Sequence, residues 1–200
     1  MAISATQVKE LRDMTGAGFM ECKAALSEAN GNLDEAVKIL RTRGQAQAAK
    51  RAGRSTAQGL VTSYIHQGGQ VGVLVDVNCE SDFVARTDDF QTLVREIAMH
   101  IAAADPLCVR RDEVPAADVE RESEIYRAQF TGSDKPPHVV EKIIEGKLNS
   151  YYAQIVLVDQ PSIRDPKTTI GNLINAAIAK LGENITVSRF ARFKVGDAND

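Results

Sequence analysis

The sequence predicts an α+β fold, in which a three-helix module is joined by a linker to a core with a small antiparallel three-stranded sheet. Apolar residues recur at helical spacing in the first 44 positions and alternate at strand spacing around residues 60–79 and 185–195. Between those strands the helical spacing returns, so we expect helices to cover one face of the sheet. We divide the chain where the pattern changes: a three-helix module at 1–44, a basic linker at 45–57, the α+β core at 58–196 and a tail at 197–200.

The composition is that of an ordinary globular protein, with 44% hydrophobic and 26% charged residues. No apolar run approaches the ~18 residues of a membrane-spanning helix, and the first residues lack the pattern of a secretory signal. We therefore expect a cytoplasmic protein with no membrane association. Cys22, Cys79 and Cys108 are odd in number and widely spaced, which argues against a disulfide framework or a zinc site and leaves any role for them open.

The N-terminal module is predicted from three apolar stripes. These are Ala5, Val8 and Leu11; Phe19, Cys22, Leu26 and Ala29; and Leu33, Ala36, Val37 and Leu40. Asn30 and Gly31 suit a left-handed turn after the second helix, and Asn32 with Glu35 forms a variant of the capping box. Met20 lies off the Phe19 stripe, so it either offers an apolar contact to a partner or fills a gap in a small core.

Residues 41–57 contain five basic side chains and no acid, whereas the chain as a whole has a net charge of −3. Frequent alanine predicts that the preceding helix extends into this stretch before Gly53 and Ser55 loosen it. A basic run can contact phosphates, but no aromatic residue between Phe19 and Tyr64 supplies a stacking platform for single-stranded nucleic acid. We interpret the stretch as a solvated linker, with a nucleic-acid contact as the alternative.

The core begins with a period of two. Strands at 60–65 and 71–79 flank a turn at 67–70, which predicts a hairpin. A helix over 88–104 follows and ends at Pro106.

The later part of the core is predicted to be largely helical. One helix starts at Pro115, and a second runs from Val139 to near Tyr152, with a bend at Gly146 as one option. Residues 155–158 are fully apolar, and their pattern leaves a helix end and a buried extended segment equally open. The last two elements are a helix that starts near Ile170 and is stopped by Gly182, and a strand with Ile185, Val187, Ala191, Phe193 and Val195 on one face.

The stretch from Asn78 to Arg86 lies between the second strand and the 88–104 helix, so it should be a strand-to-helix turn. Turns favour Gly, Pro, Asn, Asp and Ser, which makes a phenylalanine beside an acid unusual there. One interpretation is that Asp82 and Phe83 are offered to a partner protein. The other is that Asp82 caps the next helical turn while Phe83 folds into the core.

Signatures of chemical catalysis are few. The sequence has no phosphate-binding loop of the Gly-x-x-x-x-Gly-Lys type, and Gly16-x-Gly18 follows a helix rather than a strand. The three histidines lie far apart, and we interpret His100 as a packed side chain rather than a base. We therefore expect no enzyme activity, no cofactor and no metal site.

Three blocks of the sequence resemble the elongation factor Ts family, the guanine-nucleotide exchange factors of elongation factor Tu. They are Val8 to Leu40 with Thr15-Gly16-Ala17-Gly18-Phe19-Met20, then Val77 to Ala85, and more weakly Pro161 to Thr169 together with Arg189 to Gly196. The family usually has Thr where this chain has Ser81, and the hydroxyl is retained. The chain resembles the short form, with room for one core unit.

The resemblance implies both a function and a site. The first 44 residues would be similar to ubiquitin-associated domains, with Arg12, Phe19 and Met20 contacting the GTPase domain of elongation factor Tu. Ser81, Asp82, Phe83 and Val84 would enter that domain near its magnesium ion and promote GDP release. It also implies a possible homodimer and no direct contact with nucleic acid. The rival hypothesis is a nucleic-acid-binding or protein-binding adaptor that uses the basic linker and the helical module.

Overall fold

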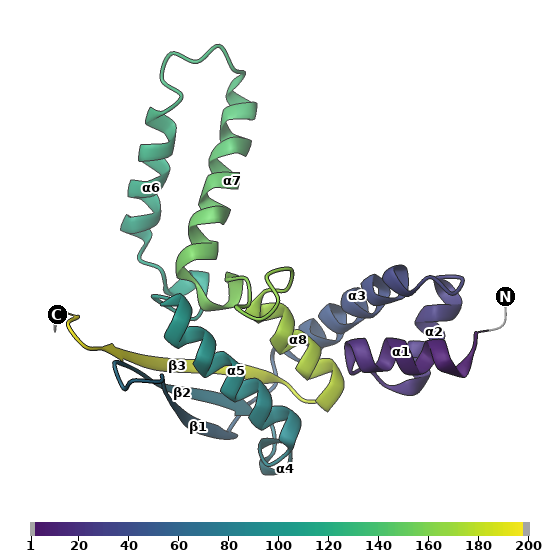
Figure 1. Ribbon diagram of the computed structural model, residues 1–200. Helices are drawn as coiled ribbons and strands as arrows, with labels where there is room; N and C mark the ends of the chain where they lie inside the picture. The colour runs from purple at the N-terminus through teal and green to yellow at the C-terminus, as the bar shows by residue number, and fades with distance from the viewer. Residues whose placement is uncertain (1–2, 198–200) are drawn as a thin grey trace. The chain divides into compact units, whose positions relative to one another are not determined.

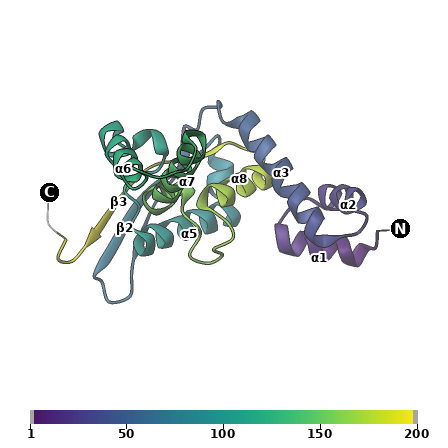
Figure 2. The ribbon, with the colours of Figure 1, turned by 90° about the horizontal axis from the view of Figure 1, so that it is seen from above.

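Three helices form the N-terminal part of this computed structural model, which describes residues 3–197 (Figures 1 and 2). They are α1 (Ala5–Thr15), α2 (Phe19–Glu28) and α3 (Leu33–Arg51). Ser4 caps α1 in a capping box with Gln7, and the Asn32 side chain accepts a hydrogen bond from the Glu35 N–H at 3.1 Å. The predicted cap of α3 is therefore confirmed, because that bond satisfies one of the free amides of its first turn.

The three helices enclose a small apolar core. Its fully buried members include Leu11, Cys22, Leu26 and Ala36. Phe19 is not among them: about half of its side-chain surface is exposed (49%). The prediction that Phe19 belongs to the buried stripe of the second helix is therefore wrong, because this residue is the first of α2 and precedes the part of the helix that packs.

Helix α3 continues through the first seven residues of the stretch that we assigned to a linker, as far as Arg51. Its second half packs on α8 (Ile170–Leu181). The contact is close at Gly44, where an added Cβ would lie 3.6 Å from the Cβ of Ala179. The Gln45 side chain donates a hydrogen bond to Asn172 Oδ1 at 3.0 Å. The boundary between module, linker and core stays a prediction.

The described residues divide into two compact units. One holds the residues up to 61 together with 76–94 and 172–187, and the other holds 62–75, 95–171 and the residues from 188 on. The strands and the long helix α5 (Asp88–Ala104) contribute a segment to each unit. A single chain element therefore often belongs partly to one unit and partly to the other.

The sheet has the strand order β1 (Gln58–Ile65), β2 (Val71–Cys79), β3 (Ile185–Lys194), as Figure 1 shows. The hairpin closes with a hydrogen bond from His66 N–H to Val71 O at 2.8 Å, and Val195 N–H donates to Gln70 O at 2.9 Å. The start of β2 therefore lies beside the end of β3, so the strands are antiparallel. The predicted three-stranded antiparallel sheet is confirmed.

One face of the sheet is buried and the other is largely open. In the first unit, Val77 and Cys79 of β2 are fully buried together with Phe90 and Val94 of α5. In the second unit, Val73 and Val75 of β2 are buried, as are Ile97 and Ile101 of α5. The predicted helix over 88–104 has the bounds of α5, because its apolar period and Pro106 define it clearly.

The two ends of β3 do not follow the single alternation that we predicted. Ile185 and Val187 are buried, but Phe193 is 72% exposed and Arg192 takes the inner side instead. Arg192 donates a hydrogen bond to Ala102 O at 3.3 Å and pairs with Asp105 at 3.0 Å. The assignment of Phe193 to the same face as Ile185 is therefore wrong.

Helices α6 (Ala116–Ala128) and α7 (Pro137–Ile155) run side by side as a helical hairpin in the second unit (Figure 1). Helix α7 passes Gly146 and ends at Ile155 rather than near Tyr152. The next residues, Val156 and Leu157, are fully buried. Val156 forms an isolated parallel β-bridge with Cys108, and a short 3₁₀ helix follows at Leu157–Asp159. The apolar run at 155–158 therefore holds both a helix end and a buried extended residue.

Within residues 3–197, no helix combines the length and the apolar character needed to cross a bilayer.

Candidate functional site

The turn after β2 forms a one-turn helix, α4 (Asp82–Ala85). Its N-cap is Ser81, whose hydroxyl oxygen accepts a hydrogen bond from the Val84 N–H at 3.3 Å. The alternative in which Asp82 is the cap is therefore not adopted. Phe83 is 83% exposed rather than packed into the core. An aromatic ring held in solvent carries a hydrophobic cost that contact with a partner would relieve.

Asp82 is also exposed and pairs with Arg86 one turn later, at 2.8 Å. Both side chains are largely accessible to solvent, so the pair contributes little to stability and can exchange partners easily. The turn thus presents a carboxylate beside an apolar ring. Such an arrangement suits recognition of another protein.

The N-terminal end of the turn is held by Glu183, a residue far away in the sequence. One carboxylate oxygen accepts the Ser81 backbone N–H at 3.0 Å, and the other accepts the Ser81 hydroxyl at 2.6 Å. Both bonds are partly buried. No local pattern in the sequence connects Glu183 with Ser81, because the two residues are 102 positions apart.

A further hydrogen bond joins the same two segments, 80–81 and 183–184, with the donor and acceptor segments exchanged. The Glu80 carboxylate accepts the Asn184 backbone N–H at 2.6 Å and pairs with Arg54 at 3.4 Å. The buried Asn184 side chain in turn donates to the Arg54 carbonyl at 2.9 Å. The end of β2, the start of β3 and the segment after α3 are therefore tied together at the base of α4.

Cys79 lies under this base, fully buried, and its thiol donates to the Ser81 carbonyl at 3.1 Å. Burial raises the pKa of the Cys79 thiol, and the nearby negative charge of Glu183 raises it further. The thiol is therefore protonated at neutral pH and acts as a packed side chain.

The residues predicted to contact a partner from the N-terminal module are all exposed. Arg12 lies on α1, while Phe19 and Met20 form the first residues of α2, with Met20 70% exposed. Met20 therefore does not fill a gap in the core, and its contact with a partner stays a prediction. Met14 is exposed as well. The predicted site residues thus come from α4 and from this module.

The described part of the chain contains no group of three or more His, Cys, Asp or Glu side chains arranged to hold a metal ion. The chemistry that α4 and the N-terminal module offer is contact by exposed apolar and charged groups.

Comparison with known proteins assigns the chain to a family. The family model described as elongation factor TS matches residues 2–197. The elongation factor Ts of Geobacter sulfurreducens is 56% identical over 197 residues, which is 98% of this chain and 91% of that protein. The elongation factor Ts of Fervidobacterium nodosum is 57% identical over 98% of this chain and its own full length. That of Koribacter versatilis is 55% identical over all of this chain and 91% of its own.

The family resemblance seen at Thr15–Met20 and Val77–Ala85 thus extends along nearly the whole sequence. The chain belongs to the elongation factor Ts family, whose members act in the elongation stage of translation.

Proposed function

We propose that this protein is a guanine-nucleotide exchange factor that binds elongation factor Tu and promotes GDP release in the cytoplasm. The observation that carries the proposal is the exposed Phe83 ring on a turn whose base is held by Glu183. Membership of the elongation factor Ts family supports it. The protein itself makes and breaks no covalent bond in this scheme.

The α4 turn supplies the wedge. Burying a phenylalanine side chain in a partner gains roughly 1.5–3 kcal/mol, so the exposed Phe83 ring favours insertion between packed side chains of the GTPase. Asp82 enters beside it and makes polar contacts there. In such GTPases a magnesium ion bridges the phosphates and protein oxygens. Displacing the groups that hold the ion removes charge neutralisation from the phosphates and weakens GDP binding.

The free energy that weakens GDP binding comes from binding of the factor to the GTPase, because coupling between two ligands is reciprocal. A factor that lowers GDP affinity must bind the nucleotide-free GTPase more tightly by the same ratio. A shift of ~10⁴-fold requires about 5.5 kcal/mol of differential binding. A buried aromatic anchor together with a second contact from the N-terminal module, through Arg12, Phe19 and Met20, can supply it.

The basic side chains at 41–57 fit this proposal better than a nucleic-acid contact. Two of the five pair with acids, Arg43 with Glu28 at 2.5 Å and Arg54 with Glu80 at 3.4 Å. These pairs reduce the positive charge offered to phosphates, and the stretch has no aromatic residue on which a base could stack, so we propose that the protein makes no direct contact with nucleic acid. The adaptor alternative predicts binding to RNA or DNA that falls steeply with salt.

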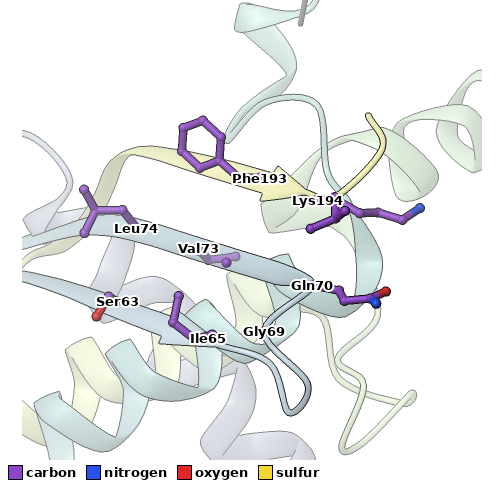
Figure 3. Close-up of a pocket in the computed structure, with 10 residues that line it drawn as sticks. Ser63, Ile65, Gly69, Gln70, Val73, Leu74, Phe193 and Lys194 are labelled. Carbon is purple, nitrogen blue, oxygen red and sulfur yellow. The ribbon is translucent and has the colours of Figure 1, made fainter. Parts of the chain in front are cut away.

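A second copy of the chain is proposed as a further partner. The open face of the sheet presents Ile65, Leu74, Phe193 and Val195, and Figure 3 shows Leu74 and Phe193 on the same side of it. A patch of this kind can meet itself across a twofold axis, which buries apolar surface on both copies. We propose a homodimer formed through this open sheet face.

The exchange proposal is tested by the release of labelled GDP from purified elongation factor Tu. Addition of the protein should accelerate release, and the double substitution Asp82→Ala with Phe83→Ala should remove most of the acceleration. Leu107→Ala is the matched control, since Leu107 is also strongly exposed (73%) but lies in the loop that follows α5. Unchanged acceleration in the folded double variant would refute the site assignment, and no acceleration by the unsubstituted protein would refute the function.

A further inference from the structure

Helix α4 lacks an anchor of its own. None of its four residues is buried, and a single helical turn is too short to be stable by itself. Its ion pair, Asp82 with Arg86, is exposed and internal to the turn, so it cannot fix the turn to the rest of the protein. The position of Phe83 must therefore be set by the bonds at the two ends of α4. At its C-terminal end the Thr87 N–H and hydroxyl both donate to the Val84 carbonyl, at 3.0 and 2.8 Å.

At its N-terminal end the bonds converge on Ser81, whose hydroxyl has one proton to donate and two lone pairs with which to accept. Its oxygen accepts from the Val84 N–H at 3.3 Å. The hydroxyl donates a hydrogen bond to one Glu183 carboxylate oxygen at 2.6 Å, and the second Glu183 oxygen accepts a hydrogen bond from the Ser81 backbone N–H at 3.0 Å. Bonds to an ionised carboxylate are stronger than neutral ones. Glu183 therefore fixes both the backbone before α4 and the direction of its capping hydroxyl.

The chain directs Glu183 to this place by a sharp turn. Gly182 has a φ of +79°, in the left-handed region, and ends α8 with a hydrogen bond from its N–H to Ile178 O at 3.0 Å. Asn184 follows, and its backbone N–H donates a hydrogen bond to the Glu80 carboxylate at 2.6 Å. Glu183 is thus held between a terminated helix and the start of a strand, which limits how far its carboxylate can move.

We propose that Glu183 is a positioning residue, which holds the Ser81 cap so that Phe83 is presented in the orientation that promotes nucleotide release. This inference rests on the exchange function proposed above. Glu183 does not touch the nucleotide or the metal in this scheme. It acts through Ser81, and its loss leaves the N-terminal contact surface in place.

The first test measures orientation without any partner. The sequence contains no tryptophan, so Phe83→Trp introduces a single tryptophan at the tip of the turn, whose emission is excited selectively at the red edge of the absorption band. Adding Glu183→Ala should lower the steady-state anisotropy of that reporter, because the turn loses both bonds. Glu113→Ala is the matched control, since its carboxylate also accepts two backbone N–H groups, from Val109 at 2.8 Å and Arg110 at 3.3 Å. Equal anisotropy in the Glu183→Ala and control proteins would overturn the proposal.

The second test measures GDP release from elongation factor Tu as a function of factor concentration. Glu183→Ala should reduce the release rate at saturating factor several-fold and change the half-saturating concentration much less. A general loss of structure would instead raise the half-saturating concentration or lower the active fraction. Glu183→Ala should also have little additional effect in a Phe83→Ala background, because both substitutions disable the same wedge. Fully independent effects would contradict the proposal.

Substitutions at Ser81 complete the test. Ser81→Thr keeps the hydroxyl and should retain the release rate, whereas Ser81→Ala should behave like Glu183→Ala. If circular dichroism shows that Glu183→Ala is unfolded, Glu183→Gln replaces it; this variant keeps one acceptor oxygen and should give a smaller loss in the same direction. If the wild type accelerates GDP release and the folded Glu183 variant accelerates it equally, the positioning role of Glu183 is refuted while the exchange function stands. No acceleration by the wild type would refute the exchange function, while the anisotropy result would still decide whether Glu183 positions the turn.

Discussion

Nε2 of His100 lies 2.9 Å from Oε1 of Gln160, with both side chains buried. The Gln160 amide nitrogen donates to two carbonyls, of Gln154 at 2.7 Å and Ala104 at 3.3 Å. The Gln160 oxygen is therefore the acceptor, and His100 must carry its proton on Nε2. This leaves Nδ1 without a hydrogen-bond partner among the described residues, where an added proton would be an unpaired buried donor.

Protonation of His100 should therefore destabilise the fold. Burial lowers the pKa of His100 below its ordinary value of 6.5, although the bond to Gln160 opposes the shift. The stabilising contribution is complete above about pH 6.5 and is lost as the pH falls towards the lower folded-state pKa. Urea unfolding at pH 7.5 and 5.5 should show a smaller decrease in stability for His100→Gln than for the wild type. An unchanged decrease would contradict this, and His138→Gln, at an exposed position, serves as the control.

The cysteines should differ in reactivity according to burial. Cys22 and Cys79 are fully buried, and burial raises the pKa of each thiol. Cys108 is partly accessible, with a pKa that burial and then Glu113 raise. At pH 7.5 a thiol reagent should label Cys108 slowly in the native protein and should label all three cysteines after denaturation. Rapid native labelling of Cys79, located by peptide mapping, would show that the base of α4 opens.

The N-terminal module should govern affinity rather than the rate at saturation. Phe19→Ala with Met20→Ala removes exposed apolar surface, so we expect a higher half-saturating concentration and little change in stability. Leu26→Ala, by contrast, removes a fully buried side chain and should cost about 2–5 kcal/mol of unfolding free energy. GDP-release titrations and urea unfolding distinguish the two effects. A double variant that binds elongation factor Tu normally would exclude this surface.

Local patterns in the sequence were enough to predict elements whose signals lie close together. The spans of α5 and α8 followed from their apolar periods with Pro106 and Gly182 as stops, and the α+β class followed from the order of the elements. Phe19 was misassigned because helical spacing marks one face of a helix but not how far packing extends along it. Phe193 was misassigned because a strand can change which side is buried partway along its length.

The exposed Phe83 turn could be anticipated because an aromatic residue is unusual in such a position. The bonds that support it could not be anticipated. Glu183 meets Ser81, and Asn184 meets Glu80, only after α8 has returned the chain to the end of β2. Pairings of this kind depend on tertiary structure, and a single sequence carries no local signal for them.

The proposed homodimer predicts a specific effect at the open sheet face. Phe193→Glu places a charge on a side chain that is 72% exposed, so it should leave the monomer folded while opposing burial against a second copy. Sedimentation should show a dimer for the wild type and for Leu107→Glu, and a monomer for Phe193→Glu. A wild-type monomer throughout the micromolar range, or a dimer unaffected by Phe193→Glu, would contradict this interface.

In the proposed function, the α4 turn promotes GDP release by displacing the partner's magnesium. The most direct measurement is the release rate from elongation factor Tu at saturating factor, with magnesium present and after its chelation, each relative to spontaneous release. We expect a smaller fold-acceleration after chelation, because the magnesium ion that the turn would displace is already absent. The difference between the two conditions should be smaller for Phe83→Ala than for the wild type. The same fold-acceleration in both conditions would contradict it.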